Sequence, residues 1–287
     1  MSVSPSPNAE HIEFWNDVLY EPFLRFRELF VTMGDAHSRG PLDRLGLKAG
    51  DGVLDVGCGF GETTLQIAER VRPGGRALGT DCCEPFLEIA RRDAAAAGLD
   101  NAEFAAVDAQ TADFEPEFDF AFARFGTMFF QNPTAGMRNI GSALKPGGRL
   151  LMIVWRPLET NKSMSFAKEI VERYVPPPPD EAPNCGPGPF SMADPTVVET
   201  ILRIAGYVEI GFEQTDVLAK VGRTVEEAMS FQLSLGPAAA IFREGGELAD
   251  RMRPAIEAEM REVLQQHERG DGVYMATSSW AVTARRA

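Results

Sequence analysis

The segment of the chain with the most obvious chemical use is a glycine-rich run at residues 55–61, DVGCGFG, between a predicted strand and a predicted helix. Glycines allow a tight turn and let the backbone approach a ligand with no Cβ in the way. The first turn of the following helix has N–H groups without intrahelical partners, which can bind an anionic or polar group. This combination favours a turn that holds a nucleotide-like cofactor, although a loop that only needs positive φ angles is the alternative.

Two further acidic residues, Asp81 and Asp108, end the next two predicted strands, RALGTD and AEFAAVD. Because the carboxyl ends of neighbouring strands in a doubly wound sheet share one crevice, we expect both side chains to converge on the glycine-rich turn. An ionised carboxylate only accepts hydrogen bonds, so Asp81 could accept both hydroxyls of a ribose and Asp108 the exocyclic amine of adenine. The alternative is that each aspartate caps a helix or ends a strand in solvent.

With these motifs the sequence resembles the class I S-adenosylmethionine-dependent methyltransferases, and more narrowly their UbiE-like branch of small-molecule enzymes. The resemblance covers about residues 50–155 and rests on VLDVGCGFG, GTD, the VDA at 107–109 and LKPGGRLLMIVW. It implies S-adenosylmethionine as cofactor, with its methionine portion on the glycine turn, its ribose on Asp81 and its adenine beside Asp108. The cofactor-binding residues that it implies are Asp55, Gly57, Cys58, Gly59, Asp81, Cys82, Asp108, Ala109, Arg124 and Phe125.

The main competing interpretation is an NAD(P)-dependent oxidoreductase, since dehydrogenases also combine a glycine turn with an acidic residue after the second strand. Their G-x-G-x-x-G pattern would need glycine at position 62, which is Glu62, and the spacing here is G-x-G-x-G. The chain also has no Tyr-x-x-x-Lys pair for a proton relay. Methyl transfer is therefore favoured, and a non-catalytic scaffold that binds an adenosyl ligand is a second alternative.

Methyl transfer from a sulfonium requires mainly that the nucleophile is held in line and that water is excluded. A general base is needed only when the nucleophile arrives protonated. Among the three histidines, His37 in the predicted loop GDAHSRG is the candidate base, with an ordinary surface histidine as the alternative. His11 and His267 are interpreted as structural residues on polar helix faces.

Aromatic and other large apolar residues fall on segments expected above the cofactor crevice. An aromatic wall would suit a planar or apolar substrate and attract a sulfonium through cation–π interactions, although aromatics at helical spacing also serve as core. The methyl acceptor is then expected to be a small apolar or aromatic molecule, methylated on oxygen, carbon or nitrogen. The candidate substrate-binding residues are Trp15, Tyr20, Met128, Phe129 and Trp155.

These residues must be positioned by alternating strands and helices, which predict an α/β fold with a mostly parallel sheet covered on both faces. The resemblance implies a Rossmann-like, seven-stranded, mostly parallel sheet with a helical lid. Strands are predicted at 52–57, 76–81, 102–108, 118–125, 149–155, 207–213 and 273–285. Helices are predicted at 62–71, 85–97, 133–144, 163–174, 195–205, 225–235 and 247–267.

The chain is expected to have three parts. Residues 1–45 form a helical segment that caps the active site, with an aromatic stripe over 11–33, and residues 46–160 form the cofactor-binding core. Residues 161–287 complete the α/β core and carry lid insertions at about 161–192 and 214–272. The first insertion contains the Pro- and Gly-rich run PPPPDEAPNCGPGP, which cannot form regular structure.

Composition narrows the function classes. The 287 residues are 44% hydrophobic, enough for a large core, and the net charge of −14 disfavours nucleic acid and anionic membranes as partners. The first ten residues lack a signal-peptide pattern and no apolar run reaches a membrane span, so a cytoplasmic protein is expected. The four cysteines lack metal-site spacing and are expected to be reduced thiols, with no metal bound. A small-molecule substrate is the expected partner, and a homodimer is left open.

Overall fold

The computed structural model describes residues 8–177 and 188–287. Cys185, one of the four predicted thiols, lies outside these ranges, and Cys58, Cys82 and Cys83 are free. In the part of the chain that is described, no helix has the length and apolar character to cross a membrane.

The molecule is built on one mixed sheet with the strand order β3-β2-β1-β4-β5-β8-β6. The first five strands are parallel, and β8 lies antiparallel between β5 and β6. A two-residue strand, β7 (Glu268–Arg269), pairs with β8 outside this order. The predicted Rossmann-like sheet of seven strands is thus confirmed, with β7 as a short addition. The strands are β1 (Gly52–Val56), β2 (Arg76–Asp81), β3 (Ala102–Ala106), β4 (Phe118–Arg124), β5 (Leu144–Trp155), β6 (Tyr207–Gly222) and β8 (Gly272–Arg286).

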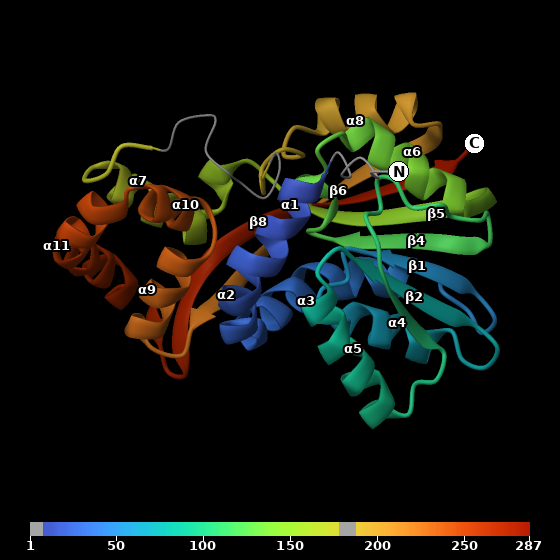
Figure 1. The fold of residues 1–287 in the computed structure, drawn as a ribbon, viewed down its shortest axis with the longest axis horizontal. Coiled ribbons are helices and arrows are strands. Elements are labelled where there is room, and N and C mark those ends of the chain that lie inside the picture. The colour runs from blue at the N-terminus through green and yellow to red at the C-terminus, as the bar shows by residue number, and fades with distance from the viewer. Residues whose placement is uncertain (1–7, 178–187) are drawn as a thin grey trace, which may run out of the picture.

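Helices cover both faces of the sheet, as Figure 1 shows. α3 (Arg27–Arg44), α4 (Glu62–Arg70) and α5 (Glu84–Ala97) lie on one face, and α6 (Pro133–Ala143) and α8 (Pro195–Ile204) lie on the other. Side chains alternate across a strand, so a central strand such as β5 contributes to two cores. In β5, Leu151 and Ile153 pack in the core with α3 and α4. The alternate residues of β5, Leu150, Met152 and Val154, pack in the core with α6 and α8.

A second group of helices lies beyond the end of the sheet, where β6 and β8 extend as a two-stranded ribbon (Figure 1). β8 pairs with β5 only from Ser279 onward, and its earlier residues pair with β6 as far as Gly222. The prediction of a lid over 214–272 was therefore wrong for its beginning, because 214–222 belong to β6. The group consists of α7 (Lys162–Glu172), α9 (Val225–Ser234), α10 (Pro237–Glu244) and α11 (Gly246–Gln265).

The N-terminal region is helical, as predicted, and lies beside the carboxyl ends of the parallel strands (Figure 1). α1 (Ala9–Glu13), the π-helix η1 (Phe14–Leu19) and α2 (Tyr20–Arg25) lead into α3. The side-chain amide of Asn16 in η1 donates to the carbonyl of Cys82 at 3.1 Å, next to the end of β2. This contact fixes the N-terminal helices against the glycine-turn side of the sheet. Two 3₁₀ turns, η2 (Thr127–Phe129) and η3 (Leu158–Thr160), follow β4 and β5.

Candidate functional site

A cavity of about 800 Å³ lies at the carboxyl ends of the parallel strands, between the N-terminal helices and the group formed by α7, α9 and α10. Its lining includes most of the predicted cofactor residues: Gly57, Cys58, Gly59, Asp81, Cys82, Asp108, Ala109, Arg124 and Phe125. It also includes four of the predicted substrate residues: Trp15, Met128, Phe129 and Trp155. Tyr20 lies elsewhere and packs on Phe86, with 5.6 Å between ring centroids. The structure thus brings together segments from five strands and from both groups of covering helices.

The glycine turn after β1 has the backbone geometry that only glycine adopts easily. Gly57 has φ +68° and Gly59 has φ +55°, both in the left-handed region. A Cβ on Gly57 would lie 2.9 Å from the Cα of Gly126, so this glycine lets the turns after β1 and β4 pack together. A Cβ on Gly59 would meet no atom within 4 Å, which leaves the cavity side of the turn open. The turn is therefore a bare backbone surface that a ligand can approach.

Asp81 at the end of β2 is bound to this turn. Its carboxylate accepts the backbone N–H of Gly59 and that of Cys83, each at 2.9 Å. Burial raises the pKa of Asp81, and these backbone N–H groups partly oppose the effect. A carboxylate has about four acceptor positions, so these two hydrogen bonds leave acceptor capacity for ribose hydroxyls. The donor set at this end of the cavity thus fits the ribose of an adenosyl cofactor.

Asp108, after β3, is used largely by its own turn. It accepts the backbone N–H of Gln110 at 2.9 Å and the hydroxyl of Thr111 at 3.4 Å. The side-chain amide of Asn8 also donates to it, which ties the N-terminal segment to the cavity rim. Asp108 therefore orders this rim as well as offering an acceptor beside the predicted adenine position.

Asp55 is not part of the cavity lining, although the resemblance implied a direct role. It is buried in β1 beneath the turn, where the hydroxyl of Thr64 donates to it at 2.7 Å. Burial raises the pKa of Asp55 to about 6, and the Thr64 hydroxyl and the charge of Arg124 act against this rise. Arg124 itself does line the cavity and lies against Gly34 of α3, where a Cβ would come within 2.9 Å of its Nε. Asp55 therefore lies behind the cavity wall, where it is hydrogen-bonded to Thr64 of α4.

Phe125 joins the end of β4 to the cavity in an uncommon conformation. Its φ is +59°, rare for an aromatic residue, and such strain is concentrated at functional sites. Its ring stacks on Trp155 with centroids 3.8 Å apart and planes inclined by 15°. Its N–H still donates to the carbonyl of Ile153 at 2.9 Å. The strained residue thus places an aromatic pair at the cavity wall while Gly126 packs on Gly57.

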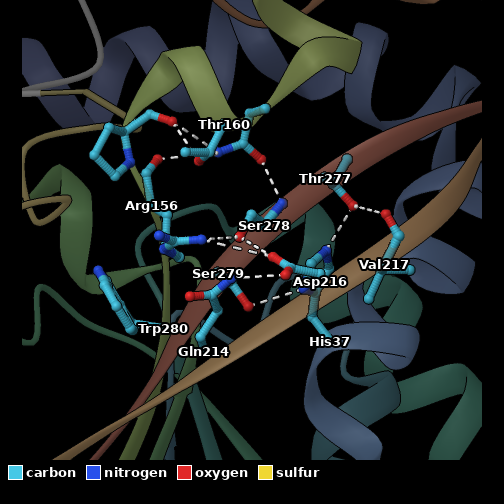
Figure 2. A network of polar contacts seen from close by, with 12 residues as sticks. His37, Arg156, Thr160, Gln214, Asp216, Val217, Thr277, Ser278, Ser279 and Trp280 are labelled. Atoms are coloured by element: carbon cyan, nitrogen blue, oxygen red, sulfur yellow. Dashed lines mark hydrogen bonds and ion pairs between the residues drawn. The ribbon is translucent and has the colours of Figure 1, made fainter.

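His37 was predicted in a loop, and this prediction was wrong, because α3 continues through it. The side chain is fully buried between α3 and β8 and does not line the cavity. Nδ1 lies 2.8 Å from the Ser279 hydroxyl and Nε2 lies 2.8 Å from the Thr277 hydroxyl (Figure 2). Thr277 donates its only hydroxyl hydrogen to the carbonyl of Val217, so His37 must donate from Nε2 and accept at Nδ1.

Burial lowers the pKa of His37 to about 4, so the ring is neutral at pH 7. Both ring nitrogens are occupied, and the ring edges face Phe125 and Trp155 at centroid distances of 5.8 and 5.1 Å. Around it, Ser278 donates to Asp216, and Arg156 donates to Ser278 at 2.9 Å (Figure 2). This arrangement supports the aromatic pair and gives no support to His37 as a general base.

The covering helices and the turn before α8 contribute lining residues that were not predicted from the sequence. His11 was placed on a polar helix face, but it is buried and lines the cavity, so that prediction was wrong. Some of the missed lining residues belong to the aromatic stripe over 11–33, which was the signal that could have identified them. No sequence motif marks the missed lining residues that come later in the chain. The missed lining residues include Phe14, Phe23, Phe30, Met33, Phe190, Phe231 and Gln232.

Several charged residues of the cavity wall have opposite charges beside them. Glu62 is paired with Arg27 at 2.7 Å, and Lys168 with Glu172 at 2.6 Å. Arg243 lies over the ring of Phe14 at 5.0 Å and 3.7 Å from the carboxylate of Glu244. The end of the cavity that lies beneath the N-terminal helices and α7, α9 and α10, called the covered end below, is therefore mainly apolar and aromatic. Its charges are partly neutralised.

Comparison with known proteins agrees with this geometry. Residues 53–148 match the family model described as a methyltransferase domain. The chain is 33% identical over 113 residues to a demethylmenaquinone methyltransferase of Lactococcus lactis, covering 39% of this chain and 45% of that one. It is 29% identical over 183 residues to a nocamycin O-methyltransferase of Saccharothrix syringae, covering 60% and 65%. The chain thus spans about half the length of most of the curated relatives it matches.

A solved structure supports the fold over nearly the whole chain. Phosphoethanolamine N-methyltransferase 2 of Haemonchus contortus, solved in complex with S-adenosyl-L-methionine, superposes with a TM-score of 0.59 at 18% identity. The match covers 96% of this chain and 60% of that chain. At this identity the likeness shows a shared fold and leaves the methyl acceptor open.

Proposed function

We propose that this chain, which carries a class I S-adenosylmethionine-dependent methyltransferase domain, transfers the cofactor's methyl group to a small, neutral, mainly aromatic molecule. The proposal rests on one observation above all. The open glycine turn and the carboxylate of Asp81 lie in the same cavity as the aromatic, covered end. One end of the cavity suits an adenosyl group and the other suits an apolar acceptor.

When bound, S-adenosylmethionine would supply a methyl group already activated on a positively charged sulfur. The residues of this chain then have three tasks: to bind, to orient and to exclude water. Asp81 and the backbone of Gly57 and Gly59 would hold the cofactor. Phe125 and Trp155 would offer ring faces near the cationic sulfur, where a cation–π attraction is favourable.

The methyl acceptor is inferred from the covered end of the cavity. Aromatic side chains there favour a planar, apolar molecule. Lys168 and Glu62 of the cavity wall are already paired, so neither offers a free charge to a strongly charged acceptor. His37 lies outside the cavity, so no proton transfer is assigned to it.

The test has two stages. Titration calorimetry with S-adenosylmethionine, S-adenosylhomocysteine and NAD identifies the cofactor, and we expect binding of the first two only. Incubation with methyl-labelled S-adenosylmethionine and a panel of neutral phenols, quinols and heteroaromatic compounds should then release S-adenosylhomocysteine and a labelled product. Binding of NAD alone would overturn the proposal, and cofactor binding without methylation of any panel member would favour the scaffold alternative.

A further inference from the structure

Gln232 is a buried polar residue on the cavity wall, and its side chain keeps an unpaired donor within the part of the chain that the structure describes. It lies in α9, is 2% exposed and lines the cavity. Its Nε2 has no hydrogen-bond partner among the residues that the structure describes. Burying an amide without a partner costs free energy, and most buried polar groups in native proteins are satisfied. An unsatisfied donor on a ligand cavity therefore calls for an acceptor from the ligand.

The segment around Gln232 is held firmly, so the amide cannot easily turn toward solvent. α9 begins at Thr224, whose hydroxyl accepts the backbone N–H of Glu227 at 3.1 Å. The adjacent Phe231 packs edge-on against Phe26 and Phe30 of the N-terminal helices, with centroid distances of 5.4 and 5.3 Å. The helix cap and these ring contacts fix the turn that presents the amide.

We propose that Gln232 donates a hydrogen bond from Nε2 to a neutral oxygen of the methyl acceptor and is a specificity-determining residue. The inference rests on the proposed function and narrows it: the acceptor is an aromatic molecule that carries a hydroxyl or carbonyl oxygen. A neutral amide suits a neutral oxygen, whereas an anionic group would be better matched by an unpaired cation. The nearby cation Lys168 is paired with Glu172.

The chain offers a matched control for this residue. Ser165 in α7 is also buried, at 3% exposed, and its hydroxyl has no partner among the described residues. Ser165 is not part of the cavity lining. Substitution of either residue removes one unsatisfied buried polar group, but only Gln232 belongs to the cavity lining.

The experiment compares two probes of similar size, 1-naphthol and 1-methylnaphthalene, that differ by an oxygen. Their affinities are measured on protein saturated with S-adenosylhomocysteine, for wild type, Gln232→Met and Ser165→Ala. We expect Gln232→Met to weaken the binding of 1-naphthol by about 3- to 10-fold, the range for one net hydrogen bond. The same variant should bind 1-methylnaphthalene as tightly as the wild type, or more tightly. Ser165→Ala should change neither affinity. Gln232→Leu serves as the second variant should Gln232→Met fail to fold.

Equal effects of Gln232→Met on both probes would overturn the inference, since this is the result expected if a trapped water satisfies the amide. Failure of the wild type to bind 1-naphthol would overturn it as well. Failure to bind S-adenosylhomocysteine is seen in the first titration and would instead refute the proposed function, on which the inference depends. The two failures are therefore distinguishable.

Discussion

Replacing Asp81 by Asn tests the cofactor end of the cavity with little change of shape. In the wild type both carboxylate oxygens accept backbone N–H groups, from Gly59 and from Cys83, each at 2.9 Å. The Asn side chain has one acceptor oxygen and one NH₂ group. Its NH₂ group would therefore face one of these backbone N–H groups, donor against donor. It also loses the charge that strengthens hydrogen bonds from a ribose. Hydrogen bonds to a charged group contribute about 1.5–3 kcal/mol, so S-adenosylmethionine should bind about 10- to 150-fold more weakly.

Titration calorimetry measures this change, and Asp119→Asn is the control. Asp119 also accepts a backbone N–H, that of Gly52 at 2.9 Å, and pairs with Lys145 at 2.8 Å, but it lies at the start of β4, outside the cavity. It should affect stability without altering cofactor affinity. Because burial raises the pKa of Asp81, wild-type affinity should also fall as the pH drops through that pKa, while the Asp81→Asn affinity should stay flat. A cofactor affinity for Asp81→Asn within threefold of the wild type would show that Asp81 does not hold the ribose.

Three further predictions concern buried groups. Since the pKa of His37 is lowered from 6.5 to about 4, the folded protein binds fewer protons than the unfolded chain between these values. Relative to His37→Gln, the wild type should lose about 3 kcal/mol of unfolding free energy as the pH falls across this window, measured by urea denaturation. The pKa of Asp55 is raised from 3.8 to about 6, so the sign is opposite. Relative to Asp55→Asn, the wild type should lose about 3 kcal/mol as the pH rises from about 4 to 6, and parallel pH profiles would contradict this. Gly57→Ala should lower the melting temperature more than Gly59→Ala, because a Cβ meets Gly126 only at position 57.

The parallel part of the sheet could be predicted from sequence because strands covered on both faces are continuous apolar runs bounded by glycine and aspartate. RLLMIVW, for example, places alternate residues in two cores and falls within β5. The convergence of the glycine turn with Asp81 and Asp108 followed from the topology of such a sheet. These features depend on local sequence pattern and on one general rule of strand order.

The remaining features depend on contacts between distant segments. The segment GDAHSRG around His37 was predicted as a loop, but α3 runs through it because its buried face packs on the sheet. Gly34 is small where the Arg124 side chain lies against the helix. The polar residues 213–216 concealed the continuation of β6, since a ribbon beyond the sheet exposes much of its surface. No local pattern marks Gln232, whose importance comes from the cavity that it faces.

We expect one cavity to bind an adenosyl cofactor at the glycine turn and a methyl acceptor beneath the helices. A crystal structure of the protein grown with S-adenosylhomocysteine tests it most directly. We expect the ribose hydroxyls on Asp81, the adenine beside Asp108 and the homocysteine portion along Gly57 and Gly59, with the sulfur facing the aromatic end of the cavity. A ligand bound elsewhere, or a ribose that makes no contact with Asp81, would contradict it.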